Sequence, residues 1–454
     1  MHSFNNTQKN NLLKDYYVDK KTFLTVVIIS SSLILITAIL IVILLTTSTN
    51  VLYENEEILR GYILTNAITA KYNVEETNKP VLLYNDKYTY LIHTIRIDGE
   101  KISEVKNEYT FDTSGEHEVK LSLKKALKTT EEFFIDCDRL TEVNLVNLTS
   151  EKISTTAKMF YNCTNLKSVD FTNYDANELT NISSMFYNCN SISSVDLSKF
   201  NGYNLKDISY LFYNCANLSS INFGSFITTY VINMSHLFYN CESFGELNLN
   251  FVTNNAQDMS HMFHGCYNLS NISQNFNTRS AIYMNNMFDG CENLLSLDLD
   301  NFRTNNLVNM SYMFNDCKSL EDLNFSMTNL SNVEDMSFML SNCKKIQDIQ
   351  LFNFTTHNLT NMSHMFNNCS DLINLNISYF LTDKVQDMSY LLYNCKNLTY
   401  IDFSSFNTTV VSNSENMFEG LPDNGTFIYD SNLLDNNILN LIPGNWTKIN
   451  KTNI

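Results

Sequence analysis

The stretch NMSYMFNDCKSLEDLNF, from Asn309 to Phe325, contains the positions of a unit that recurs along most of this chain. Its cysteine, Cys317, belongs to a series of 11 that are separated by 26 residues, except for two steps of 25. A period of this length is typical of a solenoid, in which each unit buries its apolar face only against its neighbours. The series comprises Cys137, Cys163, Cys189, Cys215, Cys241, Cys266, Cys291, Cys317, Cys343, Cys369 and Cys395.

Apolar residues follow each cysteine at fixed distances. Leucine or a similar residue lies three, six and eight positions after it, and an aromatic residue often lies at position eleven. This L-x-x-L-x-L pattern is typical of a leucine-rich repeat, and its period-2 alternation predicts one short strand per repeat. After Cys291, these residues are Leu294, Leu297, Leu299 and Phe302.

A second apolar pattern fills the rest of each repeat. Its members are three and four residues apart, a spacing that is typical of a helical turn. Strand and short helix would therefore alternate, and we expect an α/β leucine-rich-repeat solenoid, a right-handed coil with stacked short parallel strands. The pattern is illustrated by Leu307, Met310, Met313 and Phe314, and again by Leu359, Met362, Met365 and Phe366.

These repeats resemble the 26-residue surface-protein repeat of the BspA-type leucine-rich-repeat family. The resemblance is carried by Asn309 to Phe325, by NMSHMFNNCSDLINLNI from Asn361 to Ile377, and by DMSYLLYNCKNLTYIDF from Asp387 to Phe403. Tyr109 to Leu123 resembles the strand-rich N-terminal cap of the family, and Gly425 to Trp446 resembles its closing segment. The resemblance implies adhesion, or contact with a host, a matrix or a neighbouring cell.

An uncharged apolar run, FLTVVIISSSLILITAILIVILL, extends from Phe23 to Leu45. As a helix it is long enough to cross a hydrocarbon core of roughly 30 Å. Lysines precede the run and glutamates follow it, so the positive-inside rule places the N-terminus in the cytoplasm and the repeats outside the cell. The alternative is a cleaved signal peptide, but the run is longer than the usual apolar region and no A-x-A site follows it.

The expected organisation has six parts. We assign residues 1–22 to a cytoplasmic tail, 23–45 to a single transmembrane helix, 46–79 to a juxtamembrane stalk, 80–130 to a β-rich N-terminal cap, 131–420 to the repeats and 421–454 to a C-terminal cap. The protein would then lie in the cell membrane as a single-pass protein with extracellular repeats.

The charge of the chain limits its partners. The formal net charge is -18 at pH 7 and the sequence pI is about 4.8. Such a chain repels phosphate backbones and anionic headgroups, so we expect neither a nucleic acid nor a peripheral membrane surface as a partner. An extracellular protein or glycan ligand is the expected partner.

The cysteines permit two interpretations. Stacked coils about 4.8 Å apart fall within the Cα separation that a disulfide allows, and extracellular proteins often carry disulfides. However, 11 is an odd number, and side chains in one column have parallel Cβ vectors. We therefore predict a reduced structural ladder in the core. No metal is expected, because zinc sites need closely spaced ligands such as C-x2-C.

Histidines provide little support for catalysis. His236, His261 and His364 lie in one repeat column, where Tyr210 and Tyr390 also occur, and this interchange favours surface packing. No G-x-S-x-G, H-E-x-x-H or P-loop pattern is visible. We therefore expect that the protein is not an enzyme and has no cofactor.

Many N-x-S/T sequons follow the apolar run, and each is a candidate glycosylation site in a secretory pathway. The repeat itself generates N-L-S and N-M-S in an Asn-rich chain, as at Asn233, Asn268, Asn309 and Asn361. Glycosylation and a role of these residues in turns remain open alternatives at this point.

A polar residue lies seven positions after each cysteine, on the outward side of the predicted strand. Solenoids use such extended faces for recognition, so this column is a candidate ligand face. The alternative is that these residues are merely solvated. The candidate residues are Asp170, Asp196, Asn222, Asn248, Asp298, Asn324, Asn376 and Asp402.

The sequence thus predicts a membrane-anchored surface protein that adheres or binds through its repeats. One alternative is a surface receptor that signals through a cytoplasmic partner. Another is a structural coat component whose repeats associate with one another. Fold alone does not distinguish these functions.

Overall fold

The computed structural model describes residues 66–453, except for 149, 151, 274–275, 300–301, 324–328 and 352–354. These residues belong to one compact unit, Asn66–Ile454. The predicted cytoplasmic tail, the predicted transmembrane helix and most of the predicted stalk therefore lie outside the described residues. Within the described part, no helix has the length and hydropathy needed to span a bilayer.

An antiparallel cap sheet begins the unit and continues into the first repeats. Its strand order is β4-β3-β6-β1-β7-β8, in which β1 pairs antiparallel with β6 and β7 while β7 pairs parallel with β8. The strands are β1 (Ala67–Val74), β3 (Ile92–Ile97), β4 (Glu100–Lys101), β6 (Gly115–Leu123), β7 (Leu140–Asn144) and β8 (Ser168–Asp170). Nearby lie the short pair β2 (Val81–Leu82) and β5 (Glu108–Tyr109) and the 3-10 helix η1 (Asp86–Leu91).

Strand β1 falls within the range that we assigned to the stalk, so the cap sheet starts earlier in the chain than expected. Its residues alternate between the core and the surface: Ala70 and Tyr72 are buried, whereas Lys71 is half-buried and Asn73 is exposed. Because β1 joins β6 to β7, it connects the antiparallel cap to the parallel repeats.

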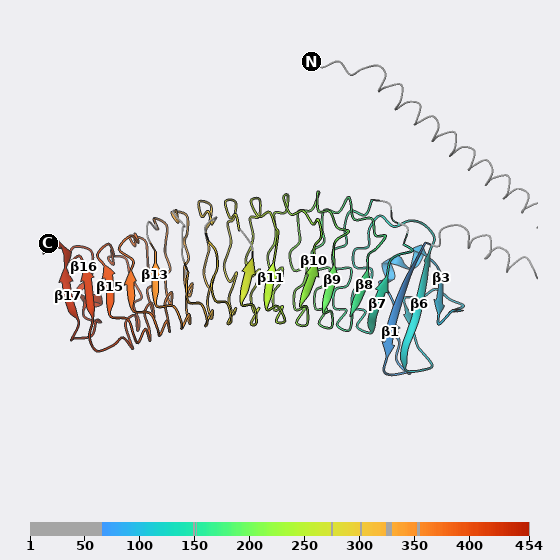
Figure 1. The fold of residues 1–454 in the computed structure, drawn as a ribbon, viewed down its shortest axis with the longest axis horizontal. Coiled ribbons are helices and arrows are strands. Elements are labelled where there is room, and N and C mark those ends of the chain that lie inside the picture. The colour runs from blue at the N-terminus through green and yellow to red at the C-terminus, as the bar shows by residue number, and fades with distance from the viewer. Residues whose placement is uncertain are drawn as a thin grey trace, which may run out of the picture. The chain divides into compact units, whose positions relative to one another are not determined.

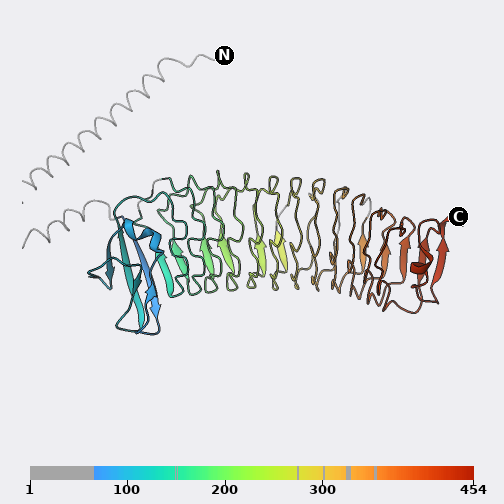
Figure 2. The same cartoon turned by 180° about the vertical axis from the view of Figure 1, so that it is seen from behind.

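The repeats form a solenoid of stacked coils, with the short strands along one wall (Figures 1 and 2). Where strands of successive repeats pair, they are parallel and in register, as in Val195 beside Ile221 and Leu375 beside Ile401. These strands are β9 (Ser194–Asp196), β10 (Ser220–Asn222), β11 (Glu246–Asn248), β12 (Asn271–Ser273), β13 (Asp348–Gln350), β14 (Asn374–Asn376) and β15 (Tyr400–Phe403).

A second wall is held by single β-bridges rather than by continuous strands. The bridges connect equivalent residues of successive coils from Thr155 to Asn413, for example Tyr283 to Asn309 and Asn309 to Asp335. We call this the bridge wall. Like the strand wall, it connects successive repeats, because each bridge joins equivalent residues of neighbouring coils.

The core lies inside the coils and consists of leucine, methionine, phenylalanine and cysteine side chains. From Phe134 to Phe314, one phenylalanine per repeat stacks on the next: the ring centroids of Phe160 and Phe186 are 5.4 Å apart, and those of Phe186 and Phe212 are 5.6 Å apart. Stacking of these side chains therefore makes the core continuous from one coil to the next.

The expected helical turn in each repeat is wrong, and with it the helical half of the predicted α/β class. In the corresponding segment, the amides of Tyr312 and Phe314 each donate at 2.9 Å to carbonyls of the next coil, whereas the amide of Met313 donates locally to Met310. Tyr312 also has a left-handed φ of 57°. In an α-helix every amide would bond to the residue four positions earlier. The segment is thus a series of turns stacked on the next coil.

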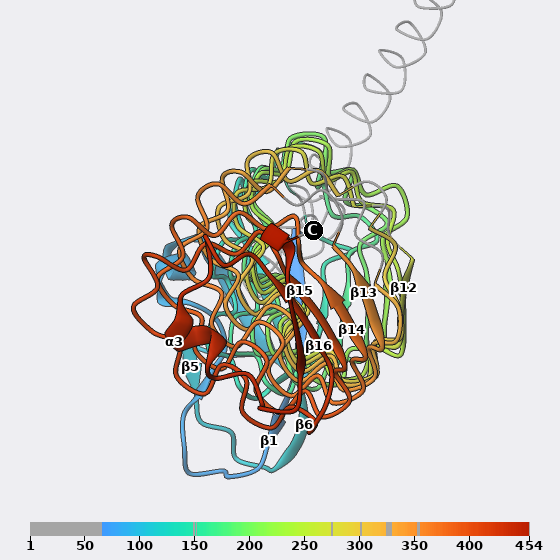
Figure 3. The ribbon, with the colours of Figure 1, turned by 90° about the vertical axis from the view of Figure 1, so that its left-hand side faces the viewer.

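The C-terminal cap closes the stack (Figure 3). Two further parallel strands, β16 (Thr426–Tyr429) and β17 (Thr447–Asn450), extend the strand wall beyond β15. The indole of Trp446 donates to the carbonyl of Pro422 at 2.8 Å and contacts Gly425, where an added Cβ would overlap the ring. The cap also contains α3 (Asn436–Leu439) and the 3-10 helix η2 (Lys451–Asn453).

Candidate functional site

The outer face of the strand wall carries most of the candidate ligand-face residues. In β9 the middle residue Val195 is only 6% exposed, whereas Ser194 and Asp196 on either side are exposed. Asn222, Asn248 and Asp298 are likewise exposed, and Asp170 and Asn376 are half-buried. We call this surface the strand face. Asn324 lies outside the described residues.

Asp402 does not face solvent, contrary to the prediction. It is only 5% exposed, and its carboxylate lies 3.3 Å from the ammonium group of Lys451. The reason is that the C-terminal cap adds η2 against this last repeat strand. Asp402 therefore belongs to the contact between the cap and the repeats, and it is not part of the strand face.

The Asp and Asn residues of the column also have a structural role that the sequence analysis missed. The Oδ1 atom of Asp196 accepts the backbone amide of Ser198 at 2.8 Å, and Oδ1 of Asp170 accepts that of Thr172 at 2.9 Å. Asn222 accepts the amide of Gly224 in the same way. Such Asx turns favour Asp and Asn at the end of a strand. The residue type is thus required by the turn, and only the remaining polar atoms are available to a ligand.

A hollow of about 410 Å³ lies at the end of the strand face that adjoins the N-terminal cap. It lies where β8 ends the six-stranded sheet, since β9 pairs only with β10 among the described strands. The hollow brings together Asp170 and Asp196, which the sequence predicted, with cap residues that it did not predict. Its charged lining consists of Lys71, Glu118, Glu142, Asp170, Asp196 and Lys199.

The electrostatics of this hollow follow from its hydrogen bonds. The side chain and backbone of Ser198 lower the pKa of Asp196, and Asn222 and Lys199 contribute to the same effect. Hydrogen bonds from Lys71 to Glu142 and Glu116, with N to O distances of 3.0 and 3.1 Å, raise the pKa of the lysine. The carboxylate of Asp196 and the ammonium group of Lys71 are therefore charged near pH 7 and suited to ion pairs and hydrogen bonds.

The 11 cysteines lie in the core, where each is fully buried and unpaired. The thiols donate to a carbonyl of the preceding coil, as from Cys291 to Phe263 and from Cys317 to Phe288, both at 3.2 Å. Burial raises the pKa of Cys291 well above its usual range. These thiols therefore fasten neighbouring coils, and the reactive thiolate form is disfavoured.

The histidines of the repeat column pack in the turns beside the cysteines. His236 stacks between Tyr210 and His261, with ring centroids 4.3 and 4.4 Å away, and His364 stacks between two aromatic rings. Burial lowers the pKa of His236 to about 4, so its imidazole is neutral at pH 7. The column is a packing feature of the turns, in keeping with its interchange with tyrosine.

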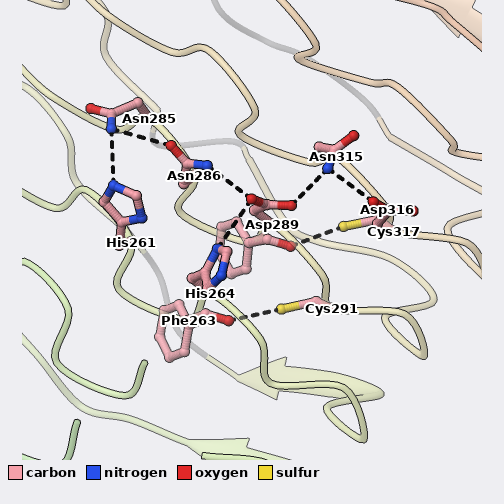
Figure 4. Close-up of polar contacts among 11 residues, drawn as sticks. His261, Phe263, His264, Asn285, Asn286, Asp289, Cys291, Asn315, Asp316 and Cys317 are labelled. Carbon is pink, nitrogen blue, oxygen red and sulfur yellow. Dashed lines mark hydrogen bonds and ion pairs between the residues drawn. The ribbon is translucent and has the colours of Figure 1, made fainter. Parts of the chain in front are cut away.

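A buried carboxylate interrupts a neighbouring aromatic column, the stack of Tyr213, Tyr239 and His264, in the middle of the solenoid (Figure 4). Asp289 is 8% exposed, lies 3.1 Å from Nδ1 of His264, and accepts hydrogen bonds of 2.8 Å from the amides of Asn286 and Asn315. Burial raises the pKa of Asp289, but these partners outweigh it and the net pKa is lowered. In the described part of the chain, no three His, Cys, Asp or Glu side chains form a group that could hold a metal ion.

The repeated sequons are part of the turns. The Oδ1 atom of Asn309 accepts both the amide and the hydroxyl of Ser311 at 2.8 Å, and Asn233 holds Ser235 in the same manner. Aspartate replaces asparagine in other repeats, as in Asp258 with Ser260. The N-x-S pattern at these positions is therefore explained by turn geometry.

Comparison with known proteins gives a match to a family model and similarity to solved structures, among them two leucine-rich proteins. The family described as "Mycoplasma protein of unknown function, DUF285" matches residues 128–249, 232–350 and 342–430. A leucine rich cell surface protein from Faecalibacterium prausnitzii A2-165 is 16% identical, with a TM-score of 0.34 over 60% of this chain and 75% of that one. A leucine-rich repeat protein from Eubacterium ventriosum ATCC 27560 is 15% identical, with a TM-score of 0.33 over 63% and 83% of the two chains. No curated protein matches the sequence.

The family match covers more than half of the chain and coincides with the cysteine-marked repeats. The resemblance of the repeats to those of BspA-type leucine-rich-repeat surface proteins is thereby confirmed. The chain belongs to the Mycoplasma protein family of unknown function DUF285.

Proposed function

We propose that the protein is a membrane-anchored cell-surface protein whose repeats bind an extracellular protein or glycan ligand. The observation that carries the proposal is the strand face, with the hollow at its cap end. Strands β8 to β14 begin and end with Ser, Asp, Asn, Glu or Gln, so this wall offers a row of polar groups, with Lys71 and Lys199 at the hollow. A long rigid row of such groups suits a ligand that makes many modest contacts.

Binding is favoured over catalysis by the chemistry of the described residues. The thiols are fully buried, with raised pKa values, and the stacked imidazole of His236 has a lowered pKa. The lining of the hollow contains neither histidine nor cysteine, and the carboxylate of Asp196 is engaged by the turn at Ser198.

The anchor is proposed from the sequence. The run from Phe23 to Leu45 has the length of a membrane-spanning helix, and Lys20 and Lys21 precede it. Protease treatment of intact cells that express the chain with a tag at each end tests this orientation. We expect loss of the C-terminal tag and protection of the N-terminal tag. The opposite pattern would rule out extracellular repeats.

Ligand binding is tested by adhesion of cells that display the full chain to immobilised matrix proteins and glycans. The informative variant combines Asp170→Asn with Asp196→Asn, because asparagine keeps the turn acceptor and removes both charges. We expect reduced adhesion, whereas a matched control on the bridge wall, Gln386→Glu, should adhere like the unmodified chain. Equal adhesion of all three proteins would exclude the hollow as the binding site.

A further inference from the structure

A second groove, of about 450 Å³, runs along the bridge wall and crosses several successive coils. Two adjacent columns of residues line it. One column carries the side-chain amides of Asn306, Asn332 and Asn358, and the other carries Gln257, Ile282, Val308 and Glu334, of which Ile282 and Val308 form an aliphatic floor. This groove is separate from the hollow on the strand face, with which it shares no residue.

In the asparagine column, the side-chain N–H groups of Asn306 and Asn332 donate to backbone carbonyls of the preceding coil. The Nδ2 atom of Asn306 donates to the carbonyl of Arg279 at 2.9 Å, and that of Asn332 donates to Asn305 at 2.7 Å. Each residue is exposed, and its amide oxygen is left as an acceptor. Asn306 and Asn332 therefore present acceptor oxygens in neighbouring coils, each held in place by the same bond, whereas the amide oxygen of Asn358 accepts from Lys384 at 2.7 Å.

The floor fixes the spacing of these acceptors. The backbone amide of Val308 donates to the carbonyl of Ile282 in the preceding coil at 2.9 Å, and the backbone amide of Glu334 donates to the carbonyl of Val308 at the same distance. Coils paired in this way repeat about every 4.8 Å. The half-buried side chains of Ile282 and Val308 thus form an apolar strip beside a column of regularly spaced amides, with Gln257 and Glu334 at the two ends of the strip.

The charge of the groove selects the class of ligand. Among the described residues, Glu334 is the one charged residue in its lining, and the one cationic side chain bonded to a lining side chain is Lys384, which donates to Asn358 at one end of the groove. Polymers that carry phosphate or sulfate need Lys or Arg contacts, so they do not fit. A neutral saccharide fits on both counts: its hydroxyl groups donate to amide and carboxylate oxygens, and its C–H faces pack on aliphatic side chains.

We propose that this groove binds a neutral linear oligosaccharide, with hydroxyl groups bonded to Asn306, Asn332 and Glu334 and sugar rings packed on Ile282 and Val308. The inference goes beyond the proposed function, because it concerns another wall of the solenoid. The ligand lies along the stack of coils, so several sugar units are bound at once.

The test uses the full chain in a detergent without a sugar headgroup, titrated with cellohexaose, chitohexaose and maltohexaose by calorimetry. Val308→Lys places a long charged chain on the apolar strip without altering the backbone bonds. We expect at least one hexasaccharide to bind, and Val308→Lys to weaken it by about tenfold or more. Glu334→Gln, which keeps an acceptor oxygen, should weaken it by less.

Gln386→Lys is the matched control, since it lies in the same column two coils beyond Glu334 and outside the groove. It should bind like the unmodified chain, and Asp196→Asn on the strand face should do the same. If Val308→Lys does not fold by circular dichroism, Ile282→Lys replaces it. The inference is overturned if no hexasaccharide binds or if the lysine variant in the groove binds as tightly as the control, and neither result bears on the strand face.

Discussion

The turns of the early repeats and those of the middle repeats have the same backbone geometry but different side chains. In both regions the residue before the cysteine is left-handed, with φ of 56° at Asn214 and 75° at Gly290. In the early repeats Asn214 donates to the asparagine of the preceding coil at 2.9 Å, and Tyr213 stacks on its neighbours at 4.4 Å. In the middle, glycine removes the amide ladder and Asp289 takes the place of the tyrosine.

This difference coincides with the two repeat steps of 25 residues, Cys241 to Cys266 and Cys266 to Cys291. Stacking of identical rings distributes stabilisation over several coils, whereas a buried carboxylate depends on every one of its partners. The middle repeats should therefore be more sensitive to single substitutions and to protonation than the early ones. The cysteine ladder, by contrast, continues through both regions.

The largest effect is expected where the two regions are alike. Cys291→Asp should unfold the solenoid, because it places a charge in a fully buried position. Cys291→Ala should cost only about 1–3 kcal/mol, from a small cavity and the lost bond to Phe263. Thermal unfolding by circular dichroism measures both. Cys189→Asp in the early repeats should behave like Cys291→Asp, and equal mild losses in all variants would show that the ladder is not interior.

The next effect separates the regions. Asp289→Leu should destabilise the protein by about 2–4 kcal/mol, because the buried amide of Asn315 and the imidazole of His264 lose their acceptor. The equivalent substitution in the early repeats, Tyr213→Leu, should cost about 1 kcal/mol, the contribution of ring stacking. Urea unfolding compares the two. A larger loss for Tyr213→Leu would contradict the idea that the middle depends on its buried carboxylate.

The cysteine spacing was sufficient to predict the stack and the strand positions, because one unit must pack on the next at a fixed period. The predicted helical turn failed at Met310 and Met313 for a physical reason. A three- and four-residue spacing reports which side chains point inward, but it does not report that alternate amides bond to the next coil. That pairing partner is 25 or so residues away in the chain and is invisible to a local pattern.

The candidate site was predictable only in part. Asp170 and Asp196 could be placed on the strand face from their repeat offset. Lys71 and Glu118 could not be placed beside them, because they reach the hollow through the long-range pairing of β1 with β6 and β7. The Asx turns were in principle visible, since Thr172 and Ser198 follow the aspartates at a two-residue interval.

Protonation should weaken the turns in a defined pH range. The pKa of His236 is about 4 in the folded protein and about 6.5 when unfolded, so the unfolded chain binds more protons between these values. The stabilising effect is complete above pH 6.5 and is lost as the pH falls toward 4. Because the imidazole is only partly buried, we expect a loss of about 1 kcal/mol between pH 7.5 and pH 5. Urea unfolding at both pH values should show a smaller loss for His236→Phe, and an unchanged loss would assign the pH dependence to other groups.

The smallest effect converts a middle turn into an early one. Gly290→Asn should be tolerated, because a Cβ there meets its nearest neighbour, Gly265, at 3.5 Å, and asparagine accepts a left-handed backbone. It should raise stability by up to about 0.5 kcal/mol by restricting the unfolded chain. Gly265→Asn is the control: its Cβ would lie 2.1 Å from the amide oxygen of Asn240, so that side chain must move and break its place in the ladder. If both substitutions destabilise the protein equally, the glycines are required by the backbone of the 25-residue steps, and the difference between the two regions lies in the length of the repeat rather than in its side chains.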